Sequence, residues 1–249
     1  MGEQGTDMRT WRLKDQDIFE IAPLRECLTA LELARKVEKT EQGIILLVGD
    51  PGTGKTVNTR IFCQESKDLP AHISIPAAGL IGTRHILSMI ARALHICGDF
   101  RSPFTLARYL IEESIIQPRI IILDNAQAIA TYKWLDVIRW LNDESSHTFV
   151  LAGTPSLEAV FAEHREFAGR VMLRYRLRPP TAEEISPLFE GFPEGVIAQV
   201  HEESEGRMRE VMALRRWLLQ LVTQKKIEID DIAPKQVSMI ARRFLMRVA

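Results

Sequence analysis

The chain has 249 residues, of which 46% are hydrophobic and 26% charged, and its formal net charge is −1. Such a composition is typical of a soluble globular protein with one ordinary core and a small appendage. No apolar run approaches the roughly 20 residues that span a bilayer, and the polar start lacks the apolar segment of a secretory signal. We therefore expect a cytoplasmic protein with no membrane partner. Three cysteines, Cys27, Cys63 and Cys97, have neither metal-ligand nor redox spacing, so reduced thiols are expected.

Residues 1–20 are expected to form a loosely ordered lead-in. Beyond them, continuous apolar runs indicate buried strands, and apolar residues spaced by three and four indicate helices. Ser102 and Pro103 are a good helix start, as cap and first helical residue. The elements expected up to residue 177 are helix Leu24–Glu38, strand Ile44–Val48, helix Lys55–Glu65, strand His72–Ile75, helix Thr83–Ile96, helix Pro103–Ile115, strand Arg119–Asp124, helix Trp134–Asn142, strand Phe149–Ala152, helix Ser156–Arg165 and strand Val171–Leu177.

This alternation of strands and helices predicts an α/β fold with a parallel five-stranded sheet and right-handed crossovers. Pro179 and Pro180 interrupt the alternation, and only helices are expected beyond them. The first of these helices begins behind a capping box of Thr181 and Glu184. The expected C-terminal helices are Ala182–Phe189, Glu194–Ser204, Arg207–Lys225 and Pro234–Val248. The sequence thus predicts a lead-in at 1–20, an α/β core at 21–178 and a small helical lid at 179–249.

A glycine-rich loop follows the first strand of the core. Its residues, Gly49, Asp50, Pro51, Gly52, Thr53, Gly54, Lys55 and Thr56, match the P-loop pattern G-x-x-x-x-G-K-[ST] at every fixed position. In such a loop backbone N–H groups surround phosphate oxygens, a lysine reaches the β- and γ-phosphates, and the hydroxyl of the last residue ligates Mg²⁺. The strand before the loop and the helix after it are the context that this motif requires. We therefore expect the chain to bind ATP and Mg²⁺.

A second part of the same site is expected at the end of the third strand. Asp124 closes the run Ile120–Leu123 and fits the Mg²⁺-side aspartate of P-loop proteins, the Walker B residue. The alternative reading is an aspartate that caps the next turn. Asp124 ends the third strand in sequence, after an intervening strand at His72–Ile75. This order predicts a sheet in which a further strand lies between the strand before the glycine loop and the strand that ends at Asp124. This order resembles the AAA+ and related ATPases, and no guanine-reading N-K-x-D sequence is present.

The residue after Asp124 departs from the usual AAA+ pattern. Hydrolysing members of that class usually carry a glutamate there, which polarises the attacking water, whereas this chain has Asn125. An asparagine can orient water but is no base at neutral pH. Tight nucleotide binding with slow or absent hydrolysis is therefore one expectation. Asp143 and Glu144 are alternative carboxylates that could substitute.

Within the AAA+ class the chain resembles the regulators of DNA transposition: the phage Mu B protein, TniB and TnsC. The P-loop, Asp124, the segment Val150–Arg170 and the segment Gly206–Arg209 follow one another in the same order. The resemblance implies that Thr154 contacts the γ-phosphate or attacking water, as sensor 1. It also implies that an arginine before the fifth strand reaches the neighbouring subunit's nucleotide.

Arg170 is the first candidate for this trans-acting arginine, and Arg165 is the second. Arg209 is the candidate for the sensor 2 contact between lid and phosphate, with Arg207 as the weaker one. For each of these arginines the alternative is an ordinary solvated surface arginine, and for Thr154 it is an ordinary turn threonine.

Charge is unevenly distributed in the expected lid. Residues 181–205 contain seven glutamates and no lysine or arginine, whereas residues 206–249 contain ten lysines and arginines against four acids. The basic part could contact phosphate backbones or an acidic partner, and the alternative is a solvated helix face.

The resemblance implies a function. We expect an ATP-dependent regulator that oligomerises as a ring or filament on double-stranded DNA and recruits or activates a transposase. Asn125 and the near-neutral charge favour a different class, a nucleotide-gated scaffold that binds proteins with little turnover. An AAA+ ATPase of secretion or replication loading would share the same core motifs and is the third possibility.

Overall fold

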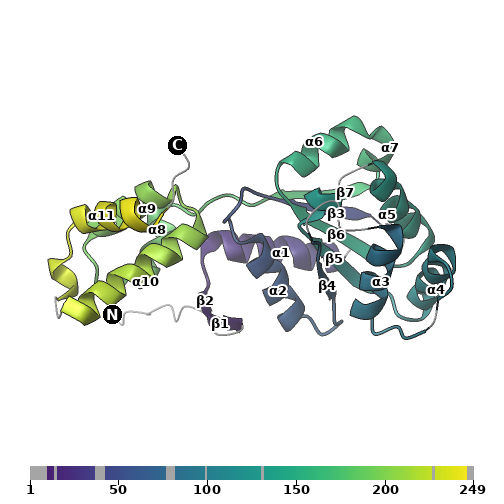
Figure 1. Cartoon of the computed structure of the whole chain (residues 1–249), viewed down its shortest axis with the longest axis horizontal. Helices are drawn as coiled ribbons and strands as arrows, with labels where there is room; N and C mark the ends of the chain where they lie inside the picture. Colours follow the sequence, from purple (N-terminus) through teal and green to yellow (C-terminus); the bar gives the residue numbers. More distant parts are fainter. Residues whose placement is uncertain are drawn as a thin grey trace. The chain divides into compact units, whose positions relative to one another are not determined.

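A computed structural model describes residues 10–13, 16–36, 43–76, 82–98, 100–129, 132–225 and 228–245. The chain divides into two compact units (Figure 1). One contains Cys27–Asp50 and Lys55–Leu177, and we call it the core unit. The other contains Met1–Glu26, Pro51–Gly54 and Arg178–Ala249, and we call it the lid unit.

The core unit is built on a parallel five-stranded sheet with the strand order β4-β5-β6-β3-β7. Its strands are β3 (Ile44–Val48), β4 (Ala71–Ser74), β5 (Ile120–Asp124), β6 (Thr148–Gly153) and β7 (Val171–Arg176). The predicted α/β fold class is confirmed. Strand β6 separates β3 from β5, as the position of Asp124 in the sequence predicts.

Alternate residues of the central strand β3 enter two different cores. Ile44, Leu46 and Val48 pack with α3 (Thr83–Ala93), α4 (Pro103–Ile116), α5 (Tyr132–Glu144) and α6 (Ser156–Glu163). Ile45 and Leu47 pack with residues of α1 (Ala22–Lys36) and α2 (Lys55–Glu65) on the opposite face. A strand buried on both faces has the continuous apolar sequence seen here. Both helix layers thus fix the strand that leads into the glycine loop.

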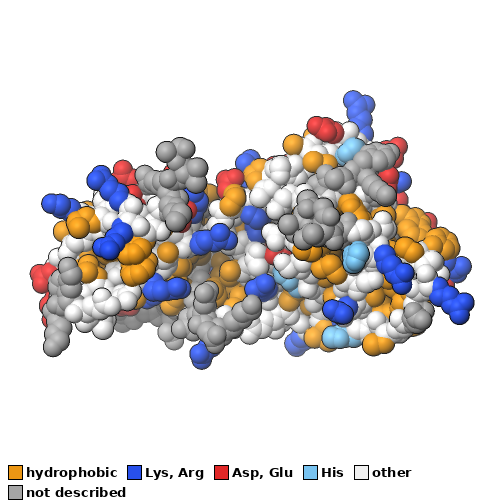
Figure 2. Space-filling model, in the orientation of Figure 1, with side chains coloured by type: hydrophobic (Ala, Val, Ile, Leu, Met, Phe, Trp, Pro, Cys, Tyr) orange, Lys and Arg blue, Asp and Glu red, His pale blue; other side chains and the backbone are white. Residues whose placement is uncertain are grey.

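Helix α4 carries apolar residues on its outer face as well. Ile115 and Ile116 are 75% and 80% exposed, and Phe104 is 63% exposed. Figure 2 shows apolar side chains gathered over this helix. The helix begins as predicted, because the Ser102 hydroxyl accepts a 3.1 Å hydrogen bond from the Thr105 N–H and Pro103 is the first helical residue.

The lid unit contains an N-terminal hairpin and a group of helices. Its helices are α8 (Ala182–Ile185), α9 (Glu194–Ser204), α10 (Met208–Lys225) and α11 (Pro234–Phe244), with 3-10 turns at Ser186–Phe189 and Ile229–Asp231. The predicted capping box is present, since the Glu184 N–H donates to the Thr181 hydroxyl and the Thr181 N–H donates to the Glu184 carboxylate. In the part of the chain that the structure describes, every helix is too short or too polar to span a bilayer.

The expectation of a loosely ordered lead-in is wrong for the described part of residues 1–20. Strands β1 (Thr10–Leu13) and β2 (Gln16–Phe19) form an antiparallel hairpin, with Trp11 opposite Ile18. Trp11 is only 7% exposed, so it is a packing residue. The sequence hides this hairpin because each strand has four residues and the pair between them, Lys14-Asp15, is not a typical hairpin turn.

Several predicted helices end earlier or divide. His164 divides the predicted helix Ser156–Arg165 into α6 and α7 (Arg165–Ala168). Helix α3 ends at Ala93, before His95, which has a positive φ of 60°. Such a backbone conformation cannot continue a right-handed helix. Residues 246–248 of the last predicted helix lie outside the described part of the chain.

Candidate functional site

The glycine-rich loop connects the end of β3 to the start of α2. Gly52 and Gly54 have φ values of 89° and 96°, which side chains with a Cβ rarely adopt. The Lys55 side chain is folded back into the loop. Its Nζ donates hydrogen bonds to the carbonyl oxygens of Gly49 (2.6 Å) and Asp50 (2.9 Å), and the residue is 9% exposed. A buried ammonium is thereby held against the loop backbone.

Asp124 lies directly beside the first turn of α2. The Thr56 hydroxyl donates a 2.7 Å hydrogen bond to Asp124 Oδ2, and the Asn125 N–H donates a 3.0 Å hydrogen bond to Oδ1. Asp124 is 1% exposed and Thr56 is partly buried. Both oxygens of a buried carboxylate therefore have donors, as burial of a charge requires. The structure thus brings together the two residues that the sequence assigned to Mg²⁺.

A histidine lies next to this pair. His72 Nε2 is 3.1 Å from the Thr59 hydroxyl oxygen and 4.0 Å from Asp124 Oδ2. Burial lowers the pKa of His72, while Asp124 opposes this change and Arg60 adds to it. The imidazole is therefore neutral at pH 7. Neither His72 nor Thr59 belongs to a sequence motif, so their place beside Asp124 is visible only in the structure.

Asn125 has a backbone conformation that suits its residue type. Its φ is 62°, in the left-handed region that asparagine tolerates better than most residues. The residue is exposed, whereas Asp124 before it is buried. The 3-10 turn Ala126–Ile129 follows at once and leads the chain away from the sheet. Asn125 therefore stands at the sheet edge where β5 ends.

Thr154 lies just past β6, at the same edge of the sheet. Its N–H donates a 3.3 Å hydrogen bond to Gln127 Oε1, and its hydroxyl is 2.7 Å from the Ser156 hydroxyl. A Cβ at Gly153 would lie 2.8 Å from Gln127 Oε1, so a larger residue there would displace the Gln127 amide from Thr154. The Gly49 N–H donates to the Gly153 carbonyl at 3.2 Å and ties the glycine loop to this turn. Gln127 is a further residue that the sequence analysis missed.

Arg170 is at the opposite edge of the core sheet. It precedes β7, and its carbonyl oxygen accepts a 2.8 Å hydrogen bond from the N–H of Ile44, the first residue of β3. In a parallel sheet these starting ends lie away from the ends that carry Asp124 and Thr154. The Arg170 guanidinium donates to Asp143, and this hydrogen bond raises the pKa of Arg170. Asp143 therefore pairs with Arg170 at the end of the sheet away from Asp124. This position argues against Asp143 as a substitute base beside Asp124.

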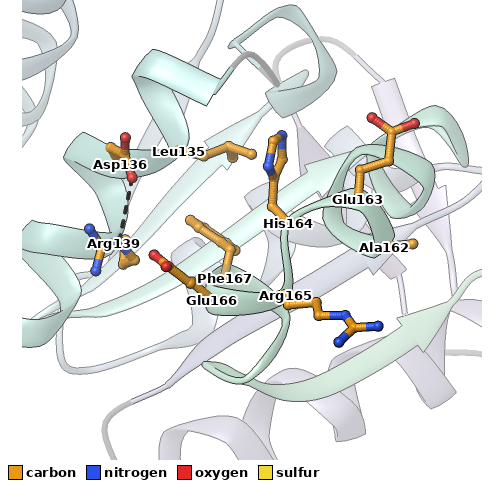
Figure 3. Close-up of a pocket in the computed structure, with 9 residues that line it drawn as sticks. All are labelled: Leu135, Asp136, Arg139, Ala162, Glu163, His164, Arg165, Glu166 and Phe167. Carbon is orange, nitrogen blue, oxygen red and sulfur yellow. Dashed lines mark ion pairs between the residues drawn. The ribbon is translucent and has the colours of Figure 1, made fainter.

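Arg165 borders a hollow of about 360 Å³ between α5, α6 and α7. Figure 3 shows Asp136 and Arg139 joined on one side of this hollow, with Nε and Oδ1 3.5 Å apart, while Arg165 extends away from them. The remaining lining is mixed, with the apolar side chains of Leu135 and Phe167 among charged ones. Arg165 lies at the start of α7, which leads through Gly169 to Arg170 and the start of β7.

Arg207 and Arg209 belong to the lid unit. The Arg207 guanidinium pairs with Glu205 (3.0 Å) and Glu210 (3.2 Å), so it is engaged within the lid. The Arg209 side chain is exposed, and its backbone N–H donates a long hydrogen bond of 3.4 Å to the Gly52 carbonyl, which belongs to the same unit. Among the described residues, ion pairs hold the guanidinium of Arg207, whereas the side chain of Arg209 is exposed.

The residues at the edge of the core sheet fit a magnesium nucleotide. A hydroxyl and a carboxylate oxygen are the hard ligands that Mg²⁺ prefers, and Mg²⁺ usually keeps water and phosphate oxygens at its other positions. The ammonium of Lys55 and the start of α2 supply positive charge for phosphate. Thr56 and Asp124 would hold the ion, and the glycine loop would hold the phosphates.

The α/β sheet and the glycine loop define the class of P-loop proteins. The chain belongs to the AAA domain family, whose family model matches residues 37–161, half of the chain. No curated protein sequence matches it.

Solved structures resemble the fold at low identity. The Aeropyrum pernix ORC1 protein in complex with DNA is 19% identical, with a TM-score of 0.64 over 90% of this chain and 64% of that one. Cdc6p from Pyrobaculum aerophilum is 19% identical, with a TM-score of 0.64 over 84% and 65%. The Thermotoga maritima RuvB Holliday junction branch migration motor is 15% identical, with a TM-score of 0.54 over 87% and 68%. The chain spans about two thirds of each, and the likeness concerns the fold.

Proposed function

We propose that this protein is an ATP-dependent regulator of DNA transposition, which assembles on double-stranded DNA in its ATP-bound state and recruits or activates a transposase. The nucleotide part rests on one observation, the 2.7 Å hydrogen bond between Thr56 and Asp124 next to the buried Lys55. These three groups supply the charge and the oxygen ligands that an Mg²⁺-bound triphosphate requires.

Each residue has a separate task in this proposal. Lys55 exchanges its carbonyl partners for β- and γ-phosphate oxygens, and Thr56 and Asp124 hold Mg²⁺, which neutralises phosphate charge when bound. Thr154 orients the γ-phosphate or the attacking water from the neighbouring turn. Arg170, at the far edge of the sheet, serves the nucleotide of an adjacent subunit, so turnover depends on assembly.

The DNA part rests on charge in the lid unit. The exposed basic residues of α10 and α11 include Arg216, Lys235, Arg242 and Arg243, and α11 has no acidic residue. Phe244 stacks on Trp217 with ring centroids 4.0 Å apart, and the Arg243 guanidinium lies 5.5 Å over the Phe244 ring. In Figure 2 basic and apolar side chains are interspersed over these helices. Such a surface suits a phosphate backbone.

The transposition part rests on the order of the motifs alone. The P-loop, Asp124, Thr154, Arg170 and Arg209 follow the order of the transposition regulators. The ORC1 protein, whose solved structure is a complex with DNA, supports DNA as a partner for a fold of this kind but gives no support for the transposition part.

The decisive experiment is negative-stain electron microscopy of the purified protein with double-stranded DNA. The unchanged protein is imaged with ATP and with ADP, and a Lys55→Ala variant is the control. Rings or filaments on DNA that need ATP and are lost in the variant support the proposal, and dispersed particles in every condition overturn it. Stimulation of a transposase encoded nearby then tests the transposition part.

The DNA surface has its own test. The double variant Arg242→Ala, Arg243→Ala should lower DNA affinity and reduce the slope of log affinity against log salt by about one to two. Arg108→Ala on α4 is the matched control, because Arg108 is exposed and pairs with Glu112.

A second candidate is a nucleotide-gated scaffold that binds proteins and hydrolyses little ATP. The observation that favours it is Asn125, an exposed amide where a carboxylate would activate water. Capture of a protein partner with ATP and without DNA would support this candidate, and strong DNA binding would count against it. A role in secretion or replication loading is the third, and the fold likeness to Cdc6p favours replication.

A further inference from the structure

We propose that His72 is a positioning residue for Asp124 and Thr56, and that it sets the affinity of this pair for Mg²⁺. The inference rests on the proposed function of that pair. No motif of the sequence includes His72, and the contacts of its side chain carry the argument.

The strand register fixes where His72 lies. Strand β4 pairs with β5 in parallel, with Ser74 opposite Asp124 and His72 opposite Ile122. His72 is therefore two residues before the level of the carboxylate and on the same face of the sheet, since side chains alternate along a strand. In this position the imidazole Nε2 lies 4.0 Å from Asp124 Oδ2. It acts through Asp124 rather than on a phosphate.

Thr59 determines which nitrogen of His72 carries the proton. The Thr59 hydroxyl is buried, and the carbonyl oxygens of Lys55 and Thr56 lie 3.1 Å and 3.2 Å from it. A hydroxyl has one proton, which these carbonyls attract, so its oxygen accepts the hydrogen bond from His72 Nε2. The Nε2–H tautomer then also places the partial positive charge of this N–H group near Asp124 Oδ2, which is 4.0 Å from Nε2.

The network therefore joins three elements of the core unit. His72 of β4 donates to Thr59 of α2, and Thr59 donates to the backbone of the two residues whose side chains define the P-loop site. Asp124 of β5 faces the same imidazole. Partners of this kind hold metal ligands in orientation, and their loss typically costs about 10- to 100-fold in metal affinity.

Two near-isosteric variants test this role. In His72→Gln the side-chain amide nitrogen can replace Nε2 as a donor to Thr59, whereas in His72→Asn the shorter side chain places its amide near the Nδ1 position. His72→Ala removes the donor altogether. The control is His147→Ala, since His147 is a buried histidine of the same core unit but accepts a 3.1 Å hydrogen bond from the Arg119 N–H, before β5.

The measurement is the affinity for a fluorescent ATP analogue, with Mg²⁺ and with EDTA. We expect His72→Ala and His72→Asn to weaken binding about 10-fold in Mg²⁺ and little in EDTA. His72→Gln should retain most of the affinity, and His147→Ala should lower the thermal midpoint without changing the Mg²⁺ dependence.

Equal weakening in Mg²⁺ and EDTA, or no difference between the Gln and Asn variants, would show that His72 is only structural. If His72→Ala does not fold, the Gln and Asn pair decides the question. Failure of the unchanged protein to bind the analogue in either buffer would instead overturn the proposed function itself.

Discussion

The Thr56 hydroxyl donates a 2.7 Å hydrogen bond to Asp124 Oδ2, although the two residues are 68 positions apart in the sequence. One is in the first turn of α2 and the other is the last residue of β5. They meet because parallel strands end at one edge of the sheet, with β6 between their two strands. The pair is therefore a product of the sheet order, and its two residues are available to hold a bound nucleotide's metal ion.

Lys55→Ala should weaken ATP binding by about 10- to 100-fold, the usual worth of a charge-assisted hydrogen bond. The ammonium that now bonds to two loop carbonyls is the charge that would meet the phosphates. Isothermal titration with ATP and Mg²⁺ measures the effect. Lys67→Ala, at an exposed lysine beyond the same helix, is the control and should bind ATP normally.

Asn125→Glu should raise the rate of ATP hydrolysis at least about 10-fold, because a general base contributes about 10²- to 10⁴-fold. Nucleotide affinity should stay the same. The variant should also lose about 1 kcal/mol of stability, since the φ of 62° suits asparagine better than glutamate. Phosphate release gives the rate, and Asn125→Gln, which adds length without a base, should stay slow. A rate unchanged in the glutamate variant would mean that position 125 does not face the water.

Arg170→Ala should abolish ATP-dependent assembly while leaving the ATP affinity of the isolated chain unchanged. The guanidinium lies at the sheet edge away from Asp124, so it has no role within its own subunit's site. Loss of the Asp143 pair should cost less than about 1 kcal/mol, because both side chains are about one third exposed. Mass photometry with and without ATP measures assembly. Assembly lost in Arg165→Ala instead would transfer the trans-acting role to the arginine beside the hollow.

Glu184→Gln should destabilise the lid unit at neutral pH but not at low pH. Arg178 forms two 2.7 Å hydrogen bonds with this carboxylate and holds the pKa of Glu184 below its ordinary value. Stability from a carboxyl with a lowered pKa is present above its unfolded value, about 4.3, and is lost as the pH falls. The difference in thermal midpoint between the unchanged protein and Glu184→Gln should therefore be largest above about pH 6 and should shrink as the pH falls to about 3, below the unfolded-state pKa. A difference independent of pH would assign the effect to the capping bond with Thr181.

The sequence predicts the sheet and the P-loop well because both depend on local pattern. A short apolar run between glycines, such as Ile44–Val48, is typical of a buried strand, and the glycine pattern restricts the loop. The sequence does not reveal His72 or Gln127, because their roles come from strand register and a turn, which bring them to Thr59 and Thr154. The hairpin at Thr10–Phe19 was missed for a related reason, since its pairing is visible only in three dimensions.

The two neighbours of β3 in the sheet, β6 and β7, both come from the second half of the chain. During synthesis the segment Ile44–Val48 therefore emerges from the ribosome long before either of its partners exists. A run of Ile, Leu and Val with no charge and no proline is the kind of segment that associates with other chains when left unpaired. We therefore expect a chain truncated before residue 148, which lacks both neighbours of β3, to be insoluble.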